Sequence, residues 1–536
     1  MAMPREGCAN GRNAVPLNRR HFITAAAALP FAGMAAASSS DPVVHTTNGP
    51  VRGALEAGIR VFRGIRYGAD TSRTRFAKPE TPTPWTDIIP ATDYGPSAPQ
   101  RGSEGRQSED CLFLNVWTPG TGDGGRRPVL VYIHGGAYNS GSGSDALYDG
   151  TRLSAHSDAV VITVNHRLNA FGYLYLEQAL PGLFPDSGNA GQWDLVLALE
   201  WVRDNASAFG GDPGRVLVFG QSGGGAKIAT LMATPAAAGL FQSAATMSGQ
   251  QVTASGPLNA GRRAQAFLQA LKLKPSEVGR IKALPVEYMV EALGVRDPLD
   301  ETQGLYFGPV LDERMLTRHP FWPDAPPQAA NIPMILGNTL DETRTLIGWR
   351  EPDMFDLTWE ALPSALGRHM RSDIDPATVV AAYRAEYPER SPAEVFFSAT
   401  TAGRSWRGQV EEADVRARQG APTWVYRFDL PWSEDGGKWG APHTVDIGYV
   451  FRNFDKPGAM PGEAAAARRI SDEISTAFVA LARAGAPLHS GIADWPQYRI
   501  PARNTLVFGD RTQVQSDPRG AERKLFSKVP FIQWGS

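Results

Sequence analysis

The sequence is poor in cysteine, in excess charge of either sign and in long apolar runs, and each shortage excludes a class of protein. It holds two cysteines in 536 residues, Cys8 and Cys111, which excludes a disulfide-rich scaffold. Lys and Arg number 53 against 55 Asp and Glu, for a formal net charge of −2. No basic field is available to hold a polyanion, so we expect no nucleic-acid partner.

Residues 1–37 have the character of a targeting segment. The pair Arg19 and Arg20 precedes an alanine-rich apolar stretch, which is interrupted by Pro30 and followed by small residues. This order is typical of a twin-arginine export signal; a chance arginine pair before a short core helix is the alternative. The apolar stretch is short for a membrane-spanning helix. We predict a signal peptide at 1–37, export to the periplasm or out of the cell, and no stable membrane span.

The rest of the chain, residues 38–536, is predicted to form a single large domain, because it shows no internal repeat and no low-complexity linker. The composition of the whole chain, with 42% hydrophobic and 20% charged residues, is ordinary for a globular protein. Removal of the signal would leave Cys111 as the single cysteine, which excludes an internal disulfide. Cys111 stands in an apolar run, where we expect a buried, unreactive thiol.

The pattern of apolar residues predicts an α/β fold. From 42 to 113, short β-like runs separated by Gly and Pro predict antiparallel strands. Near-continuous apolar runs then predict the buried strands of a mostly parallel central sheet covered on both faces; they lie at 129–133, 160–164, 216–219, 334–336 and 424–428.

Helical periodicity appears in two segments, 193–205 and 469–483, which we expect to pack on that sheet. The tracts 253–303 and 349–418 lack strand alternation. They predict helical excursions that cover an active site.

The most informative local pattern is Gly220-Gln221-Ser222-Gly223-Gly224, which lies between an apolar strand and an apolar helix. Strand, sharp turn and helix with a serine at the apex form a nucleophile elbow. Glycines flank the serine because its backbone is strained and a Cβ beside it would collide with the neighbouring elements. Ser222 is therefore the candidate nucleophile.

A glycine-rich turn of this kind also binds phosphate in other proteins, so that alternative has to be weighed. The dinucleotide motif needs Gly or Ala three residues after Gly225, where this chain has Ile228. The P-loop needs Ser or Thr after Lys227, which is absent. A serine nucleophile is the better hypothesis.

The loop at 134–138 (His-Gly-Gly-Ala-Tyr) follows the strand predicted at 129–133. Its small residues leave the backbone N–H groups unobstructed, which is what an oxyanion hole requires. We expect Gly136 and Ala137 to supply two donors and Gly223 a third. A tight turn without a catalytic role is the alternative.

Two long stretches resemble the signatures of the type-B carboxylesterase family, which includes the cholinesterases. Residues 209–224, around the serine turn, resemble the family's serine signature throughout, and residues 109–119 resemble its second signature. Shorter fragments similar to the same family lie at 62–67, 164–168 and 495–498. The resemblance covers essentially everything after residue 42. It implies an α/β-hydrolase fold with helical excursions over the active site.

The resemblance also nominates the acid. In the family it follows a strand within Gly-x-x-x-Asp-Glu-Gly, and residues 337–343 here read Gly-Asn-Thr-Leu-Asp-Glu-Thr. The match assigns the acid to Glu342. Thr343 replaces a glycine, which keeps Asp341 as a rival, and a carboxylate that merely caps the next helix is the structural alternative.

Chain order in this fold places the catalytic histidine after the acid, which leaves His369, His443 and His489. His443 is favoured because its surroundings resemble the family's Gly-Ala-x-His-Gly-x-Glu-Ile, with Thr444 in place of a glycine. His369 is expected on a helix surface and His489 in a Pro-containing loop.

The resemblance implies a serine carboxylic-ester hydrolase that acts through an acyl-enzyme, with Ser222, Glu342 and His443 as its triad. It implies a small-molecule ester as partner and no cofactor or metal, and the chain has no His-Glu-x-x-His motif. The alternatives are an amide or carbamate hydrolase, a non-catalytic esterase-like binding protein, and a degradative esterase for anionic polyesters of the fumonisin type. The oligomeric state is not predictable.

The last alternative predicts basic side chains at the mouth of the pocket. Arg167, Arg344, Arg404 and Lys227 are the candidates in the sequence. Whether they converge depends on the fold.

Overall fold

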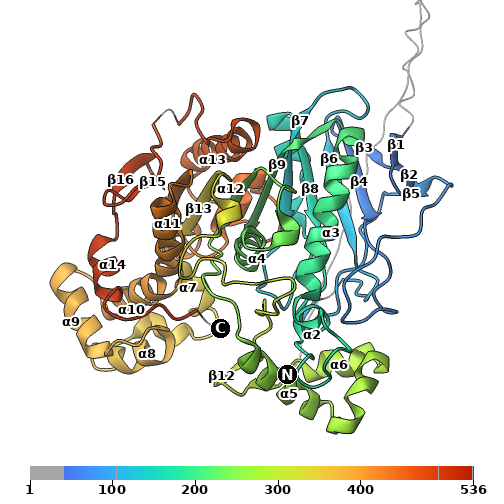
Figure 1. The fold of residues 1–536 in the computed structure, drawn as a ribbon. Helices are drawn as coiled ribbons and strands as arrows, with labels where there is room; N and C mark the ends of the chain where they lie inside the picture. Colours follow the sequence, from blue (N-terminus) through green and yellow to red (C-terminus); the bar gives the residue numbers. More distant parts are fainter. Residues whose placement is uncertain (1–40, 104, 493, 534, 536) are drawn as a thin grey trace, which may run out of the picture. The chain divides into compact units, whose positions relative to one another are not determined.

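An 11-stranded sheet runs through the described part of the chain, with the strand order β16-β15-β14-β13-β10-β9-β7-β8-β6-β4-β3 (Figure 1). The structure is a computed structural model and describes residues 41–536 except 104, 493, 534 and 536. The predicted signal peptide at 1–37 and Cys8 lie outside the described residues. Residues 41–536 form one compact unit.

The central strands are parallel, as the apolar runs predict. They are β8 (Val160–Val164), β7 (Arg127–Ile133), β9 (Gly211–Gln221), β10 (Ser243–Met247), β13 (Met334–Thr339), β14 (Thr423–Phe428) and β15 (Asn504–Phe508). Antiparallel strands extend both edges, namely β6 (Phe113–Thr118), β4 (Ile59–Arg66) and β3 (Ala54–Glu56) on one side and β16 (Gln513–Ser516) on the other. The expected α/β-hydrolase fold is confirmed.

A small separate sheet precedes the large one. It consists of β1 (Val43–Thr46), β2 (Gly49–Arg52) and β5 (Ile89–Pro90), with β1 and β2 antiparallel. The antiparallel strands predicted for residues 42–113 are thus present.

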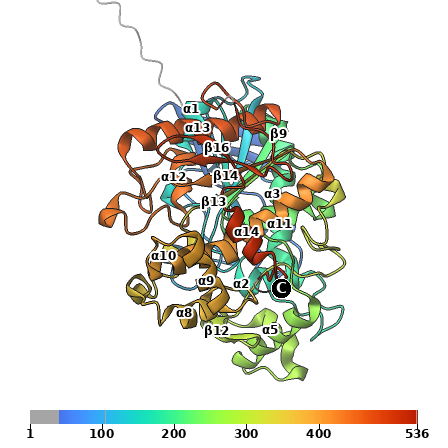
Figure 2. The same cartoon turned by 90° about the vertical axis from the view of Figure 1, so that its left-hand side faces the viewer.

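Helices flank the large sheet on both faces (Figures 1 and 2). The two helices predicted from periodicity are α3 (Ala190–Asn205) and α13 (Ala464–Ala484). Further helices are α1 (Thr151–Ser157), α2 (Asn169–Tyr173), α4 (Gly223–Met232), α7 (Glu342–Leu346), α11 (Arg407–Gln419), α12 (Val445–Phe451) and α14 (Gly520–Phe526).

The core consists of two layers because alternate side chains of a strand face opposite sides of the sheet. Val131 of β7 and Val218 of β9 pack in one apolar cluster with residues of α3, α4 and α11. Their neighbours Tyr132 and Phe219 pack in a second cluster with residues of α12 and α13. Since both faces are buried, these strands have continuous apolar sequences rather than alternating ones.

The two mixed tracts form helical excursions, as predicted. The first contains α5 (Pro257–Ala270) and α6 (Val286–Ala292), and also a hairpin that the sequence did not predict, β11 (Arg296–Asp297) with β12 (Asp300–Gly304). The second contains α8 (Leu362–His369), α9 (Pro376–Glu386), α10 (Pro392–Thr401) and a short π-helix, η8 (Ala402–Trp406). In both views these helices lie below the large sheet, in the lower part of the picture.

The structure also bears on the predictions for Cys111 and for a membrane-spanning helix. Cys111 is buried as expected, and burial raises the pKa of its thiol well above the ordinary value. None of the helices in the described part combines the length and the apolar character needed to cross a bilayer.

Candidate active site

Ser222 lies at the turn between β9 and α4, with φ 54° and ψ −123°, a conformation that side-chain-bearing residues rarely adopt. Its backbone N–H donates to the carbonyl of Met247 at 2.8 Å, which ties the turn to the end of β10. A Cβ on Gly224 would overlap the Ile133 carbonyl, and one on Gly223 would overlap the backbone of Ala137. Glycine is required at both positions because the turn packs directly on the loop after β7.

That loop, residues 134–138, lies beside the serine. A Cβ on Gly135 would lie 3.4 Å from the Ser222 Cβ. Gly136 and Ala137 have φ values of 88° and 52°, and their N–H groups donate to no acceptor within residues 41–536 as described. The N–H of Gly223, at the first turn of α4, has no intrahelical acceptor either. The three N–H groups that the sequence predicts as oxyanion donors therefore have no acceptor among the described residues and lie beside the turn at Ser222.

Lys227 holds the loop at 134–138 in place through hydrogen bonds to two of its carbonyls. It is fully buried on α4, and its Nζ donates to the Ala137 carbonyl at 2.6 Å and to the His134 carbonyl at 3.4 Å. Burial lowers the pKa of its ammonium to about 7. The sequence offered Lys227 only as a pocket cation. Because Lys227 stands in the otherwise apolar sequence of α4, the sequence could have indicated that its ammonium is buried and has a polar partner.

Glu342 and His443 are in direct contact. The Glu342 carboxylate meets Nδ1 of His443, and its other oxygen accepts from Asn338 Nδ2 at 3.0 Å and from the Thr339 N–H at 2.9 Å. Glu342 has no exposed surface. Burial raises the pKa of this carboxyl, but the contacts with His443 and the Thr339 N–H outweigh it, and the net pKa is below the ordinary value.

The rival acid Asp341 lies apart from the imidazole. Its carboxylate pairs with Arg344 at 3.1 Å and accepts from the Ala441 N–H at 3.1 Å, while its own N–H donates to the Ala441 carbonyl at 2.9 Å. Asp341 therefore joins the loop that carries Glu342 to the loop that carries His443.

The rival histidines have other partners. His369, at the end of α8, pairs with Glu351 at 3.2 Å. His489 contacts the Glu473 carbonyl at 2.9 Å. Of the three histidines after the acid, His443 is the one whose ring meets Glu342.

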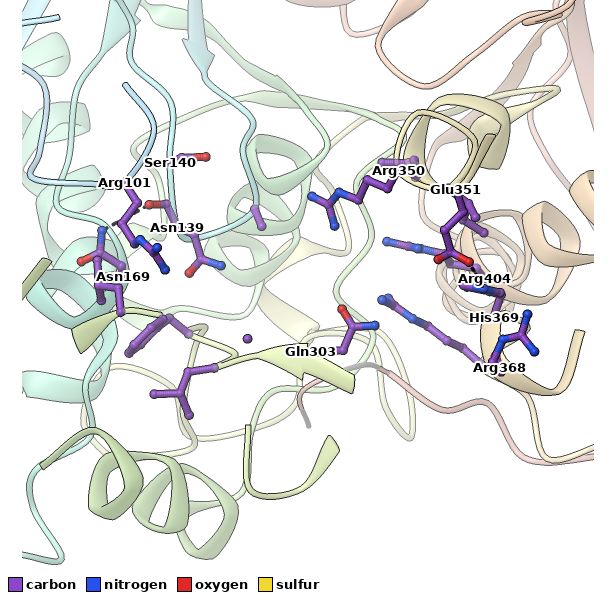
Figure 3. Close-up of a pocket in the computed structure, with 18 residues that line it drawn as sticks. Arg101, Asn139, Ser140, Asn169, Gln303, Arg350, Glu351, Arg368, His369 and Arg404 are labelled. Carbon is purple, nitrogen blue, oxygen red and sulfur yellow. Dashed lines mark hydrogen bonds and ion pairs between the residues drawn. The ribbon is translucent and has the colours of Figure 1, made fainter. Parts of the chain in front are cut away.

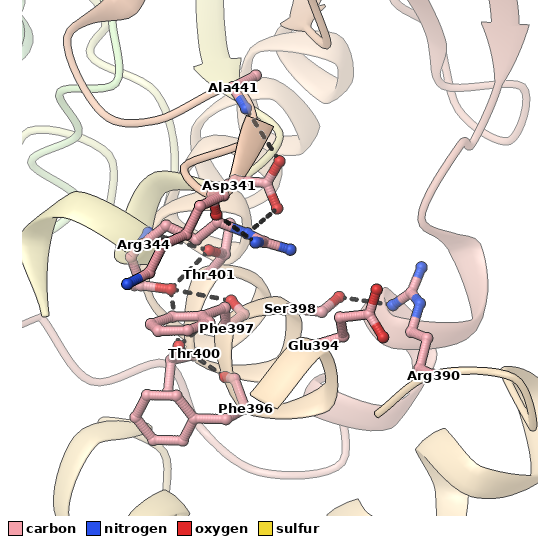
Figure 4. A network of polar contacts seen from close by, with 12 residues as sticks. Asp341, Arg344, Arg390, Glu394, Phe396, Phe397, Ser398, Thr400, Thr401 and Ala441 are labelled. Carbon is pink, nitrogen blue, oxygen red and sulfur yellow. Dashed lines mark hydrogen bonds and ion pairs between the residues drawn. The ribbon is translucent and has the colours of Figure 1, made fainter. Parts of the chain in front are cut away.

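Thr343 and Thr444, which stand where the family has glycine, differ in their backbones. Thr343 is a regular residue of α7, and its buried hydroxyl donates to the Phe397 carbonyl at 2.9 Å and contacts Thr400 and Thr401. These three partners lie on α10, where Figure 4 labels them. A glycine is not needed at position 343. Thr444 has φ 78°, in the region that favours glycine. This residue precedes α12 directly after His443.

Gln221 is a site residue that the sequence reasoning missed. Its side-chain Nε2 lies 3.1 Å from Nε2 of His443. With the Nδ1 proton directed at Glu342, Nε2 is the imidazole acceptor and takes a hydrogen bond from the Gln221 amide. The structure has no hydrogen bond between the described atoms of Ser222 and His443, although both line one cavity of about 170 Å³. The position of Gln221 inside the serine signature is the sequence feature that could have identified it as a site residue.

The four basic residues proposed for the pocket mouth do not converge. Arg167 is buried in an ion pair with Asp194 at 2.6 Å, Arg344 pairs with Asp341, and Lys227 lies beneath the loop. Arg404 of η8 is the one arginine of the set that lines the cavity of Ser222. The sequence left their convergence open, and in the structure the other three have partners of their own. Within the described residues no three potential metal ligands cluster.

Comparison with known proteins gives a consistent result. A family model described as "Carboxylesterase family" matches residues 40–526. The para-nitrobenzyl esterase of Bacillus subtilis is 35% identical over 500 residues, which cover 90% of this chain and 98% of that protein. The fumonisin B1 esterase of Sphingopyxis macrogoltabida is 30% identical over 500 residues, with 89% of this chain and 88% of that protein covered.

Solved structures agree with the sequence comparison. A crystal structure of a Geobacillus stearothermophilus carboxylesterase superimposes with a TM-score of 0.80 at 33% identity. The superposition covers 90% of this chain and 99% of that one.

Proposed function

Because this chain belongs to the carboxylesterase family, we propose that it hydrolyses carboxylic esters through a triad of Ser222, His443 and Glu342. The enzyme class itself, carboxylesterase, follows from the family and the relatives. The observation that carries the residue assignment is the buried contact between Glu342 and Nδ1 of His443, whose side chain lines the same cavity as Ser222.

In the first half-reaction, Nε2 of His443 accepts the Ser222 hydroxyl proton while Oγ attacks the ester carbonyl carbon. The Gln221 amide must first release Nε2, because a neutral imidazole nitrogen has one lone pair. Glu342 holds the ring and stabilises the imidazolium. The C–O bond to the alcohol then breaks, and the imidazolium gives its proton to the departing alkoxide oxygen.

In the second half-reaction, water attacks the acyl-enzyme. His443 accepts a proton from that water, the new C–O bond forms, and the bond to Ser222 Oγ breaks as Oγ regains the proton. The free N–H groups of Gly136, Ala137 and Gly223 stabilise the negative oxygen in both halves. The products are the acid and the alcohol, and neither a metal nor a cofactor takes part in the proposed steps.

The test of this proposal is Ser222→Ala, assayed on 4-nitrophenyl acetate and butyrate. Loss of such a nucleophile costs on the order of 10⁶-fold in kcat. Ser243→Ala, a buried serine at the start of β10, is the matched control and should retain activity. An alanine variant that keeps full turnover would overturn the assignment, and a wild type that is inactive on a wide ester panel would overturn the function.

A narrower second candidate is a degradative esterase of the fumonisin type. It is supported by the 30% identity with a fumonisin B1 esterase over most of both chains and by the presence of arginine in the active-site cavity. Hydrolysis of an amide or carbamate uses the same machinery. A purely binding role finds no support, because every triad candidate is retained.

Export through the twin-arginine route is a separate proposal and is supported by the sequence of residues 1–37. Arg19→Lys combined with Arg20→Lys should abolish export, because the pair is the feature that the route reads. The measurement is the fraction of esterase activity outside the cytoplasm. Unchanged secretion would refute the proposal.

A further inference from the structure

A second, larger cavity adjoins the one that holds Ser222. It has a volume of about 450 Å³, and the two cavities share Ala137, Leu346, Arg371 and Arg404 in their walls. The larger one is lined by five arginines, and we call it the arginine cavity: Arg101, Arg350, Arg368, Arg371 and Arg404. Arg350 and Arg404 extend from one wall toward Arg101 on the opposite wall (Figure 3).

Acidic side chains balance these arginines only in part, and the Asp300 carboxylate attracts Arg371. Glu351 is the carboxylate in the lining, and it pairs with His369 at 3.2 Å. Arg101, Arg350 and Arg404 form no ion pair with any side chain that the structure describes, and Arg368 donates to the Ser364 hydroxyl at 3.1 Å. The cavity therefore carries a surplus of positive charge beside the candidate nucleophile.

Arg101, Arg350 and Arg368 are exposed and Arg371 and Arg404 are half-buried, whereas two buried arginines elsewhere in the fold have close acidic partners. Arg167 pairs with Asp194 at 2.6 Å, and Arg263 with Asp297 at 2.7 Å. In the arginine cavity, by contrast, like charges face one another. Burial lowers the pKa of the Arg404 guanidinium, the Glu342 carboxylate raises it and Arg350 lowers it, and the net pKa is below the ordinary value. Solvent screens the repulsion among the exposed guanidinium groups, and a cavity with several cations and one carboxylate attracts an anionic ligand.

We propose that the preferred substrate is an ester that bears two or more free carboxylates, which bind in the arginine cavity while the ester carbonyl lies at Ser222. This inference rests on the proposed ester hydrolysis. Two carboxylates are inferred rather than one because guanidinium groups approach from opposite walls, as Arg101 and Arg350 do. The planar guanidinium binds a carboxylate through two parallel hydrogen bonds, which lysine cannot do.

The first experiment compares pairs of esters in which two carboxylates are free in one member and capped as methyl esters in the other. On the acyl side, the 4-nitrophenyl monoester of propane-1,2,3-tricarboxylic acid is compared with its dimethyl ester. On the alcohol side, 5-acetoxyisophthalate is compared with its dimethyl ester. We expect kcat/KM to favour the charged member of at least one pair by about tenfold or more, and the favoured pair shows which part of the ester enters the arginine cavity. The preference should shrink in 1 M NaCl.

The outcomes separate this inference from the proposed function. Turnover of all four esters without a preference for charge overturns the inference and leaves the hydrolase intact. Inactivity on all four and on neutral 4-nitrophenyl esters overturns the function itself. Free propane-1,2,3-tricarboxylate should also inhibit competitively at lower concentration than inorganic phosphate; the reverse order would overturn the assignment to carboxylates.

The second experiment substitutes single arginines of the cavity and compares kcat/KM for the charged and the neutral ester. A general loss of activity lowers both values equally and leaves their ratio unchanged. Arg350→Gln should lower the ratio of kcat/KM for the charged ester to that for the neutral ester by about tenfold. Arg350→Lys should give an intermediate ratio, because it keeps the charge and loses the paired hydrogen bonds. Arg203→Gln, an exposed arginine of α3 paired with Asp204, is the control and should leave the ratio unchanged. An unchanged ratio in Arg350→Gln and in Arg404→Gln would overturn the inference.

Discussion

Glu342 and Asp341 are neighbours in the sequence but have different partners. The Glu342 side chain enters the interior and meets His443, whereas Asp341 joins two loops through Arg344 and Ala441. Because α7 begins at Glu342, the two side chains leave the backbone in different directions. The acid of the proposed triad can therefore be distinguished from its neighbour by a pair of matched variants.

Glu342→Gln should lower kcat by about 10⁴-fold, as removal of the charge behind a catalytic histidine does in a serine protease. The amide leaves the imidazole without its anionic partner and offers it a donor instead. The control is Asp341→Asn, which should lose much less activity. Initial rates at saturating 4-nitrophenyl butyrate measure both, and greater damage in the Asp341 variant would contradict the assignment.

Lys227→Met should lower kcat by about 10²-fold with little change in KM. Its Nζ holds the carbonyls of Ala137 and His134, and without it the N–H donors of the same loop lose their alignment, for which a shift of about 1 Å is costly. Ile228→Val on the same buried helix is the control for packing and should keep kcat. Equal losses in the two variants, with equal falls in melting temperature, would show that Lys227 serves only the fold.

At this scale the sequence predicted the residues that belong to linear motifs and missed those that depend on convergence. Ser222 and the loop at 134–138 are local patterns whose chemistry is readable from their order. The arginines of the cavity come from segments far apart, such as Arg101 and Arg350, so no spacing could reveal them. Of the residues that the sequence proposed, Arg404 lines the cavity and Arg167 does not, because a single sequence does not show which arginine has an acidic partner.

At the scale of elements, strands were predicted where β-branched and large apolar residues are continuous. β10 was missed because its sequence, Ser-Ala-Ala-Thr-Met, is small and weakly apolar, although every residue of it is buried. Its neighbours on both sides, β9 and β13, pair with it along its length. Tertiary pairing therefore overrides a weak local preference.

The start of α12 contains a local strain that a substitution should relieve. Thr444 has φ 78°, and a residue with a branched Cβ costs about 1–2 kcal/mol in that region, more than glycine does. Thr444→Gly should therefore raise the free energy of unfolding by about 1 kcal/mol, measured by urea denaturation. Thr151→Gly, at the first residue of α1, should lower it. A loss of stability in both variants would contradict the argument.

At the scale of the whole molecule, buried acids make stability depend on pH. Burial raises the pKa of Glu412 on α11 to about 8, against the hydrogen bond from the Gln251 N–H and the attraction of Arg416. A carboxyl whose pKa is raised by folding contributes stability that is complete below its unfolded pKa of about 4.5. That contribution is lost as the pH rises through about 8.

Glu412→Gln should remove this part of the pH dependence, because the amide keeps the acceptor for Gln251 and cannot ionise. We expect the melting temperature of the wild type to fall more between pH 5 and pH 9 than that of the variant. Other titrating groups contribute equally to both proteins, so the difference isolates Glu412. Parallel curves would show that Glu412 is ionised at neutral pH in the folded protein.

The arginine cavity has a consequence for the step after the ester bond is broken. When the free carboxylates belong to the acyl group, hydrolysis adds one negative charge to it, so the guanidinium groups of the cavity hold the product acid more strongly than the substrate. With such a substrate, departure of the acid rather than acyl transfer limits turnover. The enzyme then works fastest where the released acid is consumed or diluted.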